Sequence, residues 1–243
     1  MQCQPADIKQ LGTILGIWAH PDDEAWAMAG LIAIARRNQQ RVVLITATRG
    51  DAGKTANETR WPQTQLGEIR TKELEDCLRL LDVSEHYWLD YEDGGLAAAG
   101  SATAVKQLTD IMNDVRPDSV FTFEPNGITG HSDHKTICSW AHQAVSESNL
   151  PVTAYGAIES AENYEQACCD CQTILKDIYF NTDKPVTKPM NKMDLCIPLP
   201  TDIQDLKLRA LKCQPSQTKQ LFDDPEGLIF IKAHARCECF TKL

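Results

Sequence analysis

Short apolar segments alternate with longer segments of helical periodicity over residues 1–160. The short segments are rich in Val, Ile and Leu, which is typical of strands buried on both faces. The first long segment is apolar nearly all round, which indicates a helix buried between other elements. The predicted strands cover residues 11–19, 41–47, 86–91, 119–123 and 152–158, and the predicted helices cover residues 24–39, 64–82, 101–115 and 132–147.

This alternation predicts a three-layer α/β fold, in which right-handed crossovers connect a mostly parallel sheet. The chain has 243 residues, a length that one α/β domain commonly reaches. We therefore expect a single domain over residues 1–243, with its core at about 11–158 and a C-terminal part at 159–243. Residues 160–200 contain scattered cysteines and prolines, and we expect irregular structure or edge strands there.

Two predicted strands end in loops that are dense in His, Asp and Glu, at residues 20–24 and 124–134. Functional residues of such sheets lie at the carboxyl ends of the strands. Part of each loop has an ordinary structural interpretation, because acids near Pro21 suit the start of a helix and Ser132 or Asp133 could cap the next one. Helix capping does not require the histidines, so they point to chemistry.

Two imidazoles and one carboxylate would provide three metal ligands and leave a fourth tetrahedral position for water. Bound zinc lowers the pKa of such a water from 15.7 toward about 7, which produces a nucleophile at neutral pH. Asp22 and Asp23 are adjacent, so their side chains point in different directions. One of them can bind the ion while the other acts as a base.

Five motifs in this order resemble those of the PIG-L, or LmbE-like, family of N-acetylglucosaminyl deacetylases. The resemblance spans about residues 12–145 and fades beyond them, so we expect residues 159–243 to shape the substrate pocket. It implies a Rossmann-like zinc hydrolase that removes the acetyl group from an acetamido sugar and releases acetate. The motifs are AHPDDE at 19–24, TRGDAGK at 48–54, GEIRTKEL at 67–74, YEDGGL at 91–96 and EPNGITGHSDH at 124–134.

The metal ligands implied by this resemblance are His20, Asp23 and His134, which would bind one zinc ion per chain. The same donor set also suits Fe²⁺, since two histidines and one carboxylate form the facial triad of non-haem iron enzymes. Oxygen consumption with a 2-oxoacid would indicate such an iron enzyme. A sugar-binding relative without catalysis is a further alternative, and loss of activity in Asp22→Asn with the metal retained would argue against it.

The catalytic residues implied by the resemblance are Asp22, His131 and Asp133. Asp22 would be the general base, and His131 would polarise the carbonyl group or protonate the leaving amine. Contacts to sugar hydroxyls would come from Arg70 and Asp93.

The chain departs from the family pattern at two positions that are not metal ligands. Gln214 stands where a late helix of the family usually has histidine, and Thr129 stands where some members have tyrosine. A separate alternative is nucleotide binding by GDAGKT at residues 50–55. A phosphate-binding loop of that type needs glycine at position 48, where this chain has Thr48, so we do not expect one.

The net charge of −10 argues against a nucleic-acid partner, because binding to phosphates needs a basic surface. No apolar run reaches the ~18 residues of a membrane span, and the stretch before residue 11 lacks the positive charge of a signal peptide. We therefore expect a cytoplasmic protein that acts on a small acetamido-sugar conjugate, without nucleic acid or membrane, and that could form a homo-oligomer.

Ten cysteines are present, and five of them form clusters, at residues 168–171 and 237–239. The spacings are C-C-x-C and C-x-C, whereas structural zinc sites use paired C-x-x-C. We expect ordinary thiols at these positions rather than a second metal site.

Overall fold

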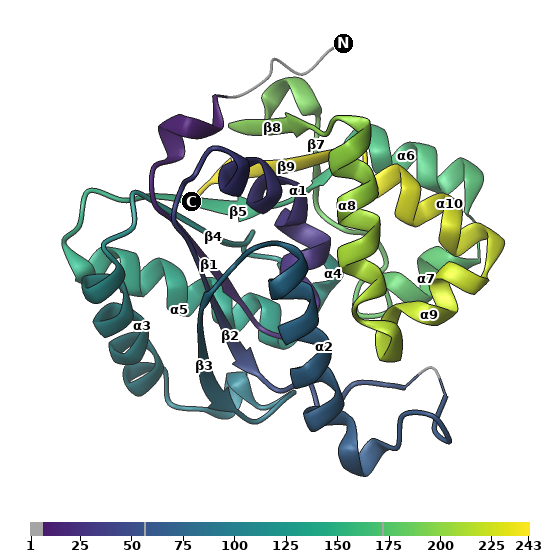
Figure 1. Ribbon diagram of the computed structural model, residues 1–243, viewed down its shortest axis with the longest axis horizontal. Coiled ribbons are helices and arrows are strands. Elements are labelled where there is room, and N and C mark those ends of the chain that lie inside the picture. The colour runs from purple at the N-terminus through teal and green to yellow at the C-terminus, as the bar shows by residue number, and fades with distance from the viewer. Residues whose placement is uncertain (1–6, 56, 172) are drawn as a thin grey trace.

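The computed structural model describes residues 7–55, 57–171 and 173–243, and a seven-stranded sheet forms its centre (Figure 1). The strand order is β3-β2-β1-β4-β5-β9-β8, and the first five strands in this order are parallel. β9 is antiparallel to both β5 and β8. The strands are β1 (Ile14–Trp18), β2 (Val42–Thr48), β3 (Glu85–Tyr91), β4 (Ser119–Phe123), β5 (Thr153–Ala157), β8 (Leu195–Pro198) and β9 (Cys237–Lys242).

Helices cover both faces of this sheet, with α3 packed on α5 on one face and α1 packed on α8 on the other (Figure 1). A separate two-stranded sheet joins β6 (Glu159–Ser160) to β7 (Thr187–Lys188). Short 3-10 turns lie at Ile8–Leu11, Gln63–Gln65, Leu96–Ala98 and Met190–Lys192. The helices are α1 (Asp23–Arg37), α2 (Leu66–Leu80), α3 (Ser101–Val115), α4 (Gly127–Gly130), α5 (Ser132–Ser148), α6 (Ala161–Asp170), α7 (Ile174–Ile178), α8 (Thr201–Lys212), α9 (Pro215–Asp223) and α10 (Pro225–His234).

The predicted three-layer α/β fold with a mostly parallel sheet is confirmed. β1, β2 and β4 are buried along their whole length, as continuous apolar strands between two helical layers should be. The expectation of a single domain over 1–243 stays a prediction, and its residues 1–6, 56 and 172 lie outside the described part of the chain.

The prediction of irregular structure over residues 160–200 is wrong for the first part of that segment. Residues 161–170 form helix α6, which begins where the Ser160 hydroxyl accepts the backbone N–H of Asn163. No proline interrupts residues 161–178, so the helical hydrogen bonds of α6 and α7 are possible there. The predicted edge strand is present, because β8 is the last strand of the main sheet.

A second, smaller apolar cluster joins α6, α7 and α10 beside the main core. It contains Ala167, Ile174, Tyr179 and Phe230, and packs against Trp26 of α1. This cluster is built entirely from the C-terminal part of the chain. Three of its residues, Ile174, Tyr179 and Phe230, form a wall of the cavity that His20 and His134 also line.

A buried ion pair joins α8 and β9 to the middle of α1. Glu238 accepts the backbone N–H groups of Gly30 and Leu31 at 2.8 and 2.7 Å. Lys207 Nζ donates to Glu238 Oε1 and to the Trp26 carbonyl oxygen, both at 2.7 Å. The Gly30 N–H and the Trp26 carbonyl oxygen are four residues apart, which is the spacing of the donor and acceptor of a helical hydrogen bond. The ion pair contacts both of these backbone groups.

Replacing Lys207 by methionine should destabilise the protein strongly, because it leaves the Glu238 carboxylate buried without its cation. We expect the free energy of unfolding to fall by about 3–5 kcal/mol, measured by urea denaturation. Lys219→Met is the matched control, since Lys219 forms an exposed pair with Asp223, which should contribute at most about 1 kcal/mol. Equal effects of the two substitutions would contradict this role for Lys207.

A second buried charge network holds α10 against β6. Glu159 accepts hydrogen bonds from Tyr179 Oη at 3.0 Å and His234 Nε2 at 2.7 Å. Burial alone would lower the pKa of His234, but the Glu159 carboxylate raises it above its ordinary value of 6.5. Burial alone would raise the pKa of Glu159, but His234 and Tyr179 hold it below its ordinary value of 4.5.

These two shifts predict a pH-dependent contribution to stability. The histidine contribution is complete below pH 6.5 and is lost as the pH rises through the raised pKa of His234. The carboxylate contribution is complete above pH 4.5 and is lost as the pH falls through the lowered pKa of Glu159. Urea denaturation should show that His234→Gln costs more stability between these limits than at alkaline pH. A penalty independent of pH would show that the ion pair does not contribute.

Candidate active site

The candidate site lies where β1 and β4 end side by side at the centre of the sheet. The chain leaves β1 toward β2 on one side, and β4 is followed by β5 on the other, so the two loops diverge around a crevice. The loop after β1 carries His20, and the loop after β4 leads to His131 and His134 at the start of α5. The topology thus brings together residues that are more than 100 positions apart.

Three side chains converge in this crevice: His20, Asp23 and His134. His20 Nδ1 lies 3.2 Å from His134 Nε2 and 3.6 Å from Asp23 Oδ2. His134 Nε2 lies 3.4 Å from Asp23 Oδ1. Ligand bonds of about 2.0–2.1 Å in a tetrahedron place neighbouring ligand atoms about 3.3 Å apart. The spacing of these nitrogen and oxygen atoms therefore fits a small divalent cation.

Hydrogen bonds on the far side of each ring fix the orientation of the two imidazoles. His134 Nδ1 lies 3.0 Å from the Gly127 carbonyl oxygen, so it carries the proton and leaves the lone pair on Nε2. The same ring stacks on Phe123 with centroids 3.9 Å apart. His20 Nε2 lies 3.0 Å from Asp93 Oδ1 and 3.4 Å from Asp133 Oδ2. Both rings thus have the outer partners that metal-binding histidines use.

The charges around these rings favour a cation. Burial alone would lower the pKa of His20, but Asp133, Asp23 and Asp93 together raise it well above its usual value. Burial alone would raise the pKa of Asp23, but His134 and His20 hold it far below its usual value. Metal binding here would replace any proton carried by these ligand atoms.

Asp22 lies beside the three converging residues in a strained backbone conformation. Its φ is 106°, which is rare for a residue other than glycine, and its side chain does not cap α1. Asp22 Oδ2 lies 3.3 Å from Arg70 Nη2. Burial raises the pKa of Asp22 to about 6, although Arg70 opposes this shift.

His131 takes the capping role that the sequence suggested for Ser132 or Asp133. Its Nδ1 accepts the Asp133 backbone N–H at 3.2 Å, so a neutral His131 ring carries its proton on Nε2. This cap leaves the Asp133 carboxylate free to accept the Gly94 N–H at 2.8 Å and to lie beside His20. The Asp133 carboxylate thus contacts His20, and its predicted catalytic role stays a prediction.

The two residues predicted to bind substrate also support other site residues. Arg70 is buried and donates to the Pro21 and Gly50 carbonyl oxygens at 2.5 and 2.9 Å. One carboxylate oxygen of Asp93 accepts the Ala52 N–H at 2.8 Å, and its other oxygen faces His20. Both residues line the cavity described below, and their contact with substrate stays a prediction.

The glycine-rich loop after β2 encloses the Arg70 guanidinium group. A Cβ atom added at Gly50 would lie 2.4 Å from Arg70 Nη1, and one added at Gly53 would lie 2.8 Å from the same atom. Gly50 also has a φ of +67°. These glycines therefore allow a close approach of Arg70, which is a different use from cradling a phosphate.

The two departures from the family pattern lie at different depths. Gln214 is fully buried and its Nε2 faces Glu24 Oε1 at 3.4 Å. Thr129 lines the cavity, with its hydroxyl 3.5 Å from His134 Nδ1. The sequence did not identify Glu24 as a site residue. Burial raises the pKa of its carboxyl group to about 8. Its only sequence signal was its place at the end of the AHPDDE motif.

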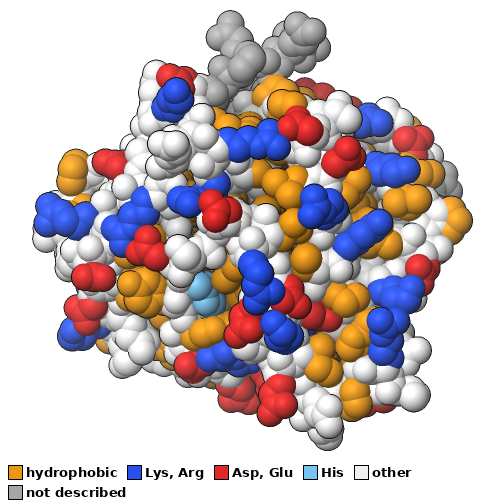
Figure 2. All heavy atoms as spheres, viewed as in Figure 1, with side chains coloured by type: hydrophobic (Ala, Val, Ile, Leu, Met, Phe, Trp, Pro, Cys, Tyr) orange, Lys and Arg blue, Asp and Glu red, His pale blue; other side chains and the backbone are white. Residues whose placement is uncertain are grey.

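A cavity of about 880 Å³ opens above the converging residues, at the upper end of the range for ligand sites. Its polar end is the site just described. Its other end is lined by Phe230 of the smaller apolar cluster, by Trp26, which packs against that cluster, and by Glu159 and His234. On the face shown in Figure 2, Lys and Arg side chains are interspersed with Asp and Glu.

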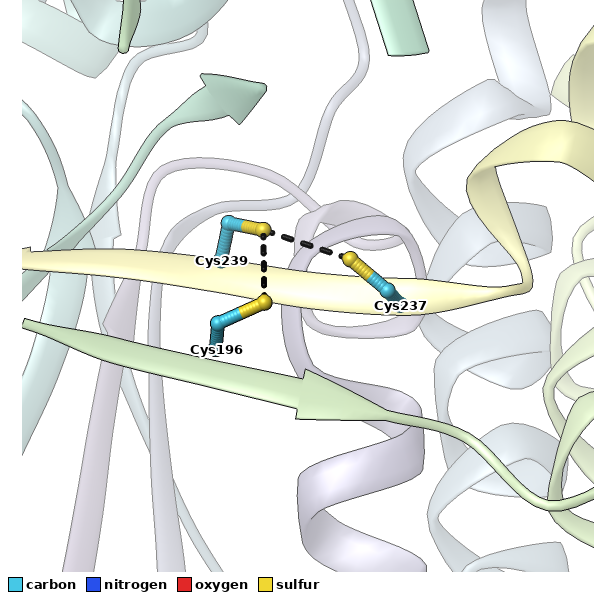
Figure 3. A group of neighbouring side chains, drawn as sticks. All are labelled: Cys196, Cys237 and Cys239. Atoms are coloured by element: carbon cyan, nitrogen blue, oxygen red, sulfur yellow. Dashed lines mark hydrogen bonds between the residues drawn. The ribbon is translucent and has the colours of Figure 1, made fainter. Parts of the chain in front are cut away.

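A cluster of sulfur atoms lies on the antiparallel edge of the sheet (Figure 3). Cys239 Sγ lies 3.3 Å from Cys237 Sγ and 3.7 Å from Cys196 Sγ. Among the cysteines of the other cluster, Cys168 and Cys169 are exposed. The expectation of ordinary thiols at residues 168–171 and 237–239 stays a prediction.

The sequence model described as GlcNAc-PI de-N-acetylase, PIG-L, matches residues 15–145, which is more than half of the chain. The chain belongs to this family. A 1D-myo-inositol 2-acetamido-2-deoxy-alpha-D-glucopyranoside deacetylase of Nocardia farcinica is 34% identical over 144 residues, covering 51% of this chain and 48% of that protein. The chain therefore spans about half the length of the curated relatives it matches.

Solved structures share the fold over nearly the whole chain. The N,N'-diacetylchitobiose deacetylase of Pyrococcus horikoshii matches with a TM-score of 0.70 and 25% identity, covering 97% of this chain and 85% of that one. The 4-carboxy-2-hydroxymuconate hydratase of Pseudomonas putida matches with a TM-score of 0.65 and 14% identity, covering 96% of each chain. The similarity to the hydratase shows only that the two proteins share a fold. Within the described residues, no helix has the length and apolar character to cross a membrane.

Replacing His134 by alanine should remove stoichiometric binding of a divalent ion, because one of the three converging donors is lost. Elemental analysis after gel filtration measures the bound metal. His142→Ala is the control, since His142 is exposed on the same helix. Full metal content in His134→Ala would show that His134 is not a ligand.

Proposed function

We propose that this protein is a metal-dependent N-deacetylase that hydrolyses the acetamide of an N-acetylglucosamine-type conjugate and releases acetate. The main support is the convergence of His20, Asp23 and His134 in the crevice, with the Asp22 carboxylate beside them. We propose zinc as the ion, with Fe²⁺ as the alternative that the same donors would accept. An ion held there would supply a Lewis acid and lower the pKa of the attacking water.

Asp22 would accept the proton of the attacking water. Its carboxylate is held by Arg70, which also binds the Pro21 carbonyl oxygen on the preceding residue. This arrangement keeps the base in one orientation. Holding reacting groups in a fixed orientation accounts for much of the rate increase of an enzymatic reaction over the same reaction in solution. The strained φ of Asp22 belongs to the same arrangement.

His131 would act on the other side of the acetamide. The proton on Nε2 of its neutral form would donate to the carbonyl oxygen as negative charge develops there. Asp22 or His131 would then transfer a proton to the nitrogen as the C–N bond breaks, so that one amide and one water become one amine and one acetic acid. Asp133 and Asp93 would act through His20 by holding its ring in place.

The names of the relatives support the proposed substrate class. The Nocardia protein is named for an acetamido sugar joined to inositol, and the Pyrococcus protein for a disaccharide of two acetamido sugars. The cavity is large enough to accept more than the reacting group, since it continues from the ion-binding end to the apolar cluster. We propose a small acetamido-sugar conjugate as the substrate.

An acetate-release screen across N-acetyl sugars, with and without a chelator, tests this function. We expect Asp22→Asn to lower kcat by about 10²- to 10⁴-fold while elemental analysis finds the metal retained. Asp51→Asn is a control, because Asp51 is an exposed carboxylate on the neighbouring loop. Activity near that of the wild type in Asp22→Asn would exclude the base. Oxygen consumption with a 2-oxoacid, without acetate release, would favour the iron alternative.

A further inference from the structure

The most exposed large apolar side chain of the described residues lies on the wall of the candidate active-site cavity. Phe180 follows α7 and is 66% exposed, compared with 46% for Ile229 and 44% for Val186. It lines the same cavity as His20 and His134. Phe180 therefore presents a large aromatic surface on the wall of this cavity, where a ligand in the cavity can cover it.

The segment that carries Phe180 is attached to the catalytic loop. Gly130, which directly precedes His131, has a φ of +79°. A Cβ atom added at Gly130 would lie 2.8 Å from the Asn181 carbonyl oxygen and 3.1 Å from Thr182 Cβ. The backbone next to Phe180 therefore packs directly on the turn before His131.

Neighbouring contacts hold the same segment from its other side. The Thr182 N–H donates to the Tyr179 carbonyl oxygen at 3.0 Å, which closes a turn around Phe180. The Tyr179 hydroxyl in turn bonds to buried Glu159. Phe180 thus projects from an anchored turn, and an anchored aromatic ring binds a ligand with little further loss of entropy.

A cation from a distant part of the sequence approaches the same ring. Lys54, on the loop after β2, lies with Nζ 5.9 Å from the centroid of Phe180 and also lines the cavity. Because the ammonium group lies over this ring, the cavity wall presents an aromatic surface together with a hydrogen-bond donor. This pairing suits a saturated ring that has C–H groups on one face and hydroxyls at its edge. Sugars and cyclitols have this chemistry.

We propose that Phe180 and Lys54 form a subsite for a second hydroxylated ring, attached to the acetamido sugar. Phe180 would stack on the C–H face of that ring, and Lys54 would donate to its hydroxyls. This inference rests on the proposed function and names the part of the chain that selects two-ring substrates over single sugars.

Calorimetric binding of the deacetylated products, chitobiose and glucosamine, to the metal-loaded protein tests this subsite without requiring turnover. We expect Phe180→Ala to weaken chitobiose binding by about 3- to 10-fold, the range for one lost aromatic contact. Binding of glucosamine should stay unchanged, and Phe180→Trp should preserve the preference for two rings. Ile229→Ala is the control, since Ile229 is exposed and does not line the cavity.

The acetate-release assay adds a kinetic readout. For a two-ring substrate, Phe180→Ala should raise KM with little change in kcat, whereas both constants for N-acetylglucosamine should stay as they are. Equal weakening for one and two rings, or wild-type protein that binds chitobiose no better than glucosamine, would overturn the subsite. Absence of acetate release with an intact two-ring preference would instead contradict only the proposed function.

Discussion

The Asp23 carboxylate is the interaction on which the rest of the site depends. One of its oxygens accepts the backbone N–H groups of Ala19 and His20 at 3.1 and 2.7 Å, which fixes the turn from β1 into α1. The other oxygen faces His134 at the start of α5. A single buried carboxylate therefore holds its own loop in shape and links it to a loop that follows a different strand.

Such a buried negative charge needs compensation, and the imidazoles of His20 and His134 provide part of it. The two imidazoles lie next to it, and the carboxylates of Asp93 and Asp133 lie behind His20. Three acids around one histidine leave the centre rich in negative charge, which an ion would balance. The same excess explains why Arg70 is buried at the edge of the site, beside Asp22.

The C-terminal part of the chain completes the cavity with a wall of its own. Two buried charge networks attach this wall to the core, one through Lys207 and Glu238 and the other through Glu159 and His234. Both networks include residues that line the cavity. The shape of the cavity beyond the reacting group therefore depends on how α8 and α10 pack. Sequence differences in these helices can change which ring the cavity accepts without altering the ion-binding end.

The sequence by itself determined the layers of the fold, because continuous apolar strands and helical periodicity are local signals that predicted every parallel strand of the main sheet. The order of residues also showed two strand ends rich in metal-binding side chains, and the resemblance to the PIG-L family singled out His20, Asp23 and His134 among them. Only the tertiary structure decided what Asp93, Asp133 and Arg70 contact, because their partners are backbone groups and rings brought close by the sheet order. Helix α6 and the wall around Phe180 also needed the folded chain, since their stability comes from packing between segments that are distant in sequence.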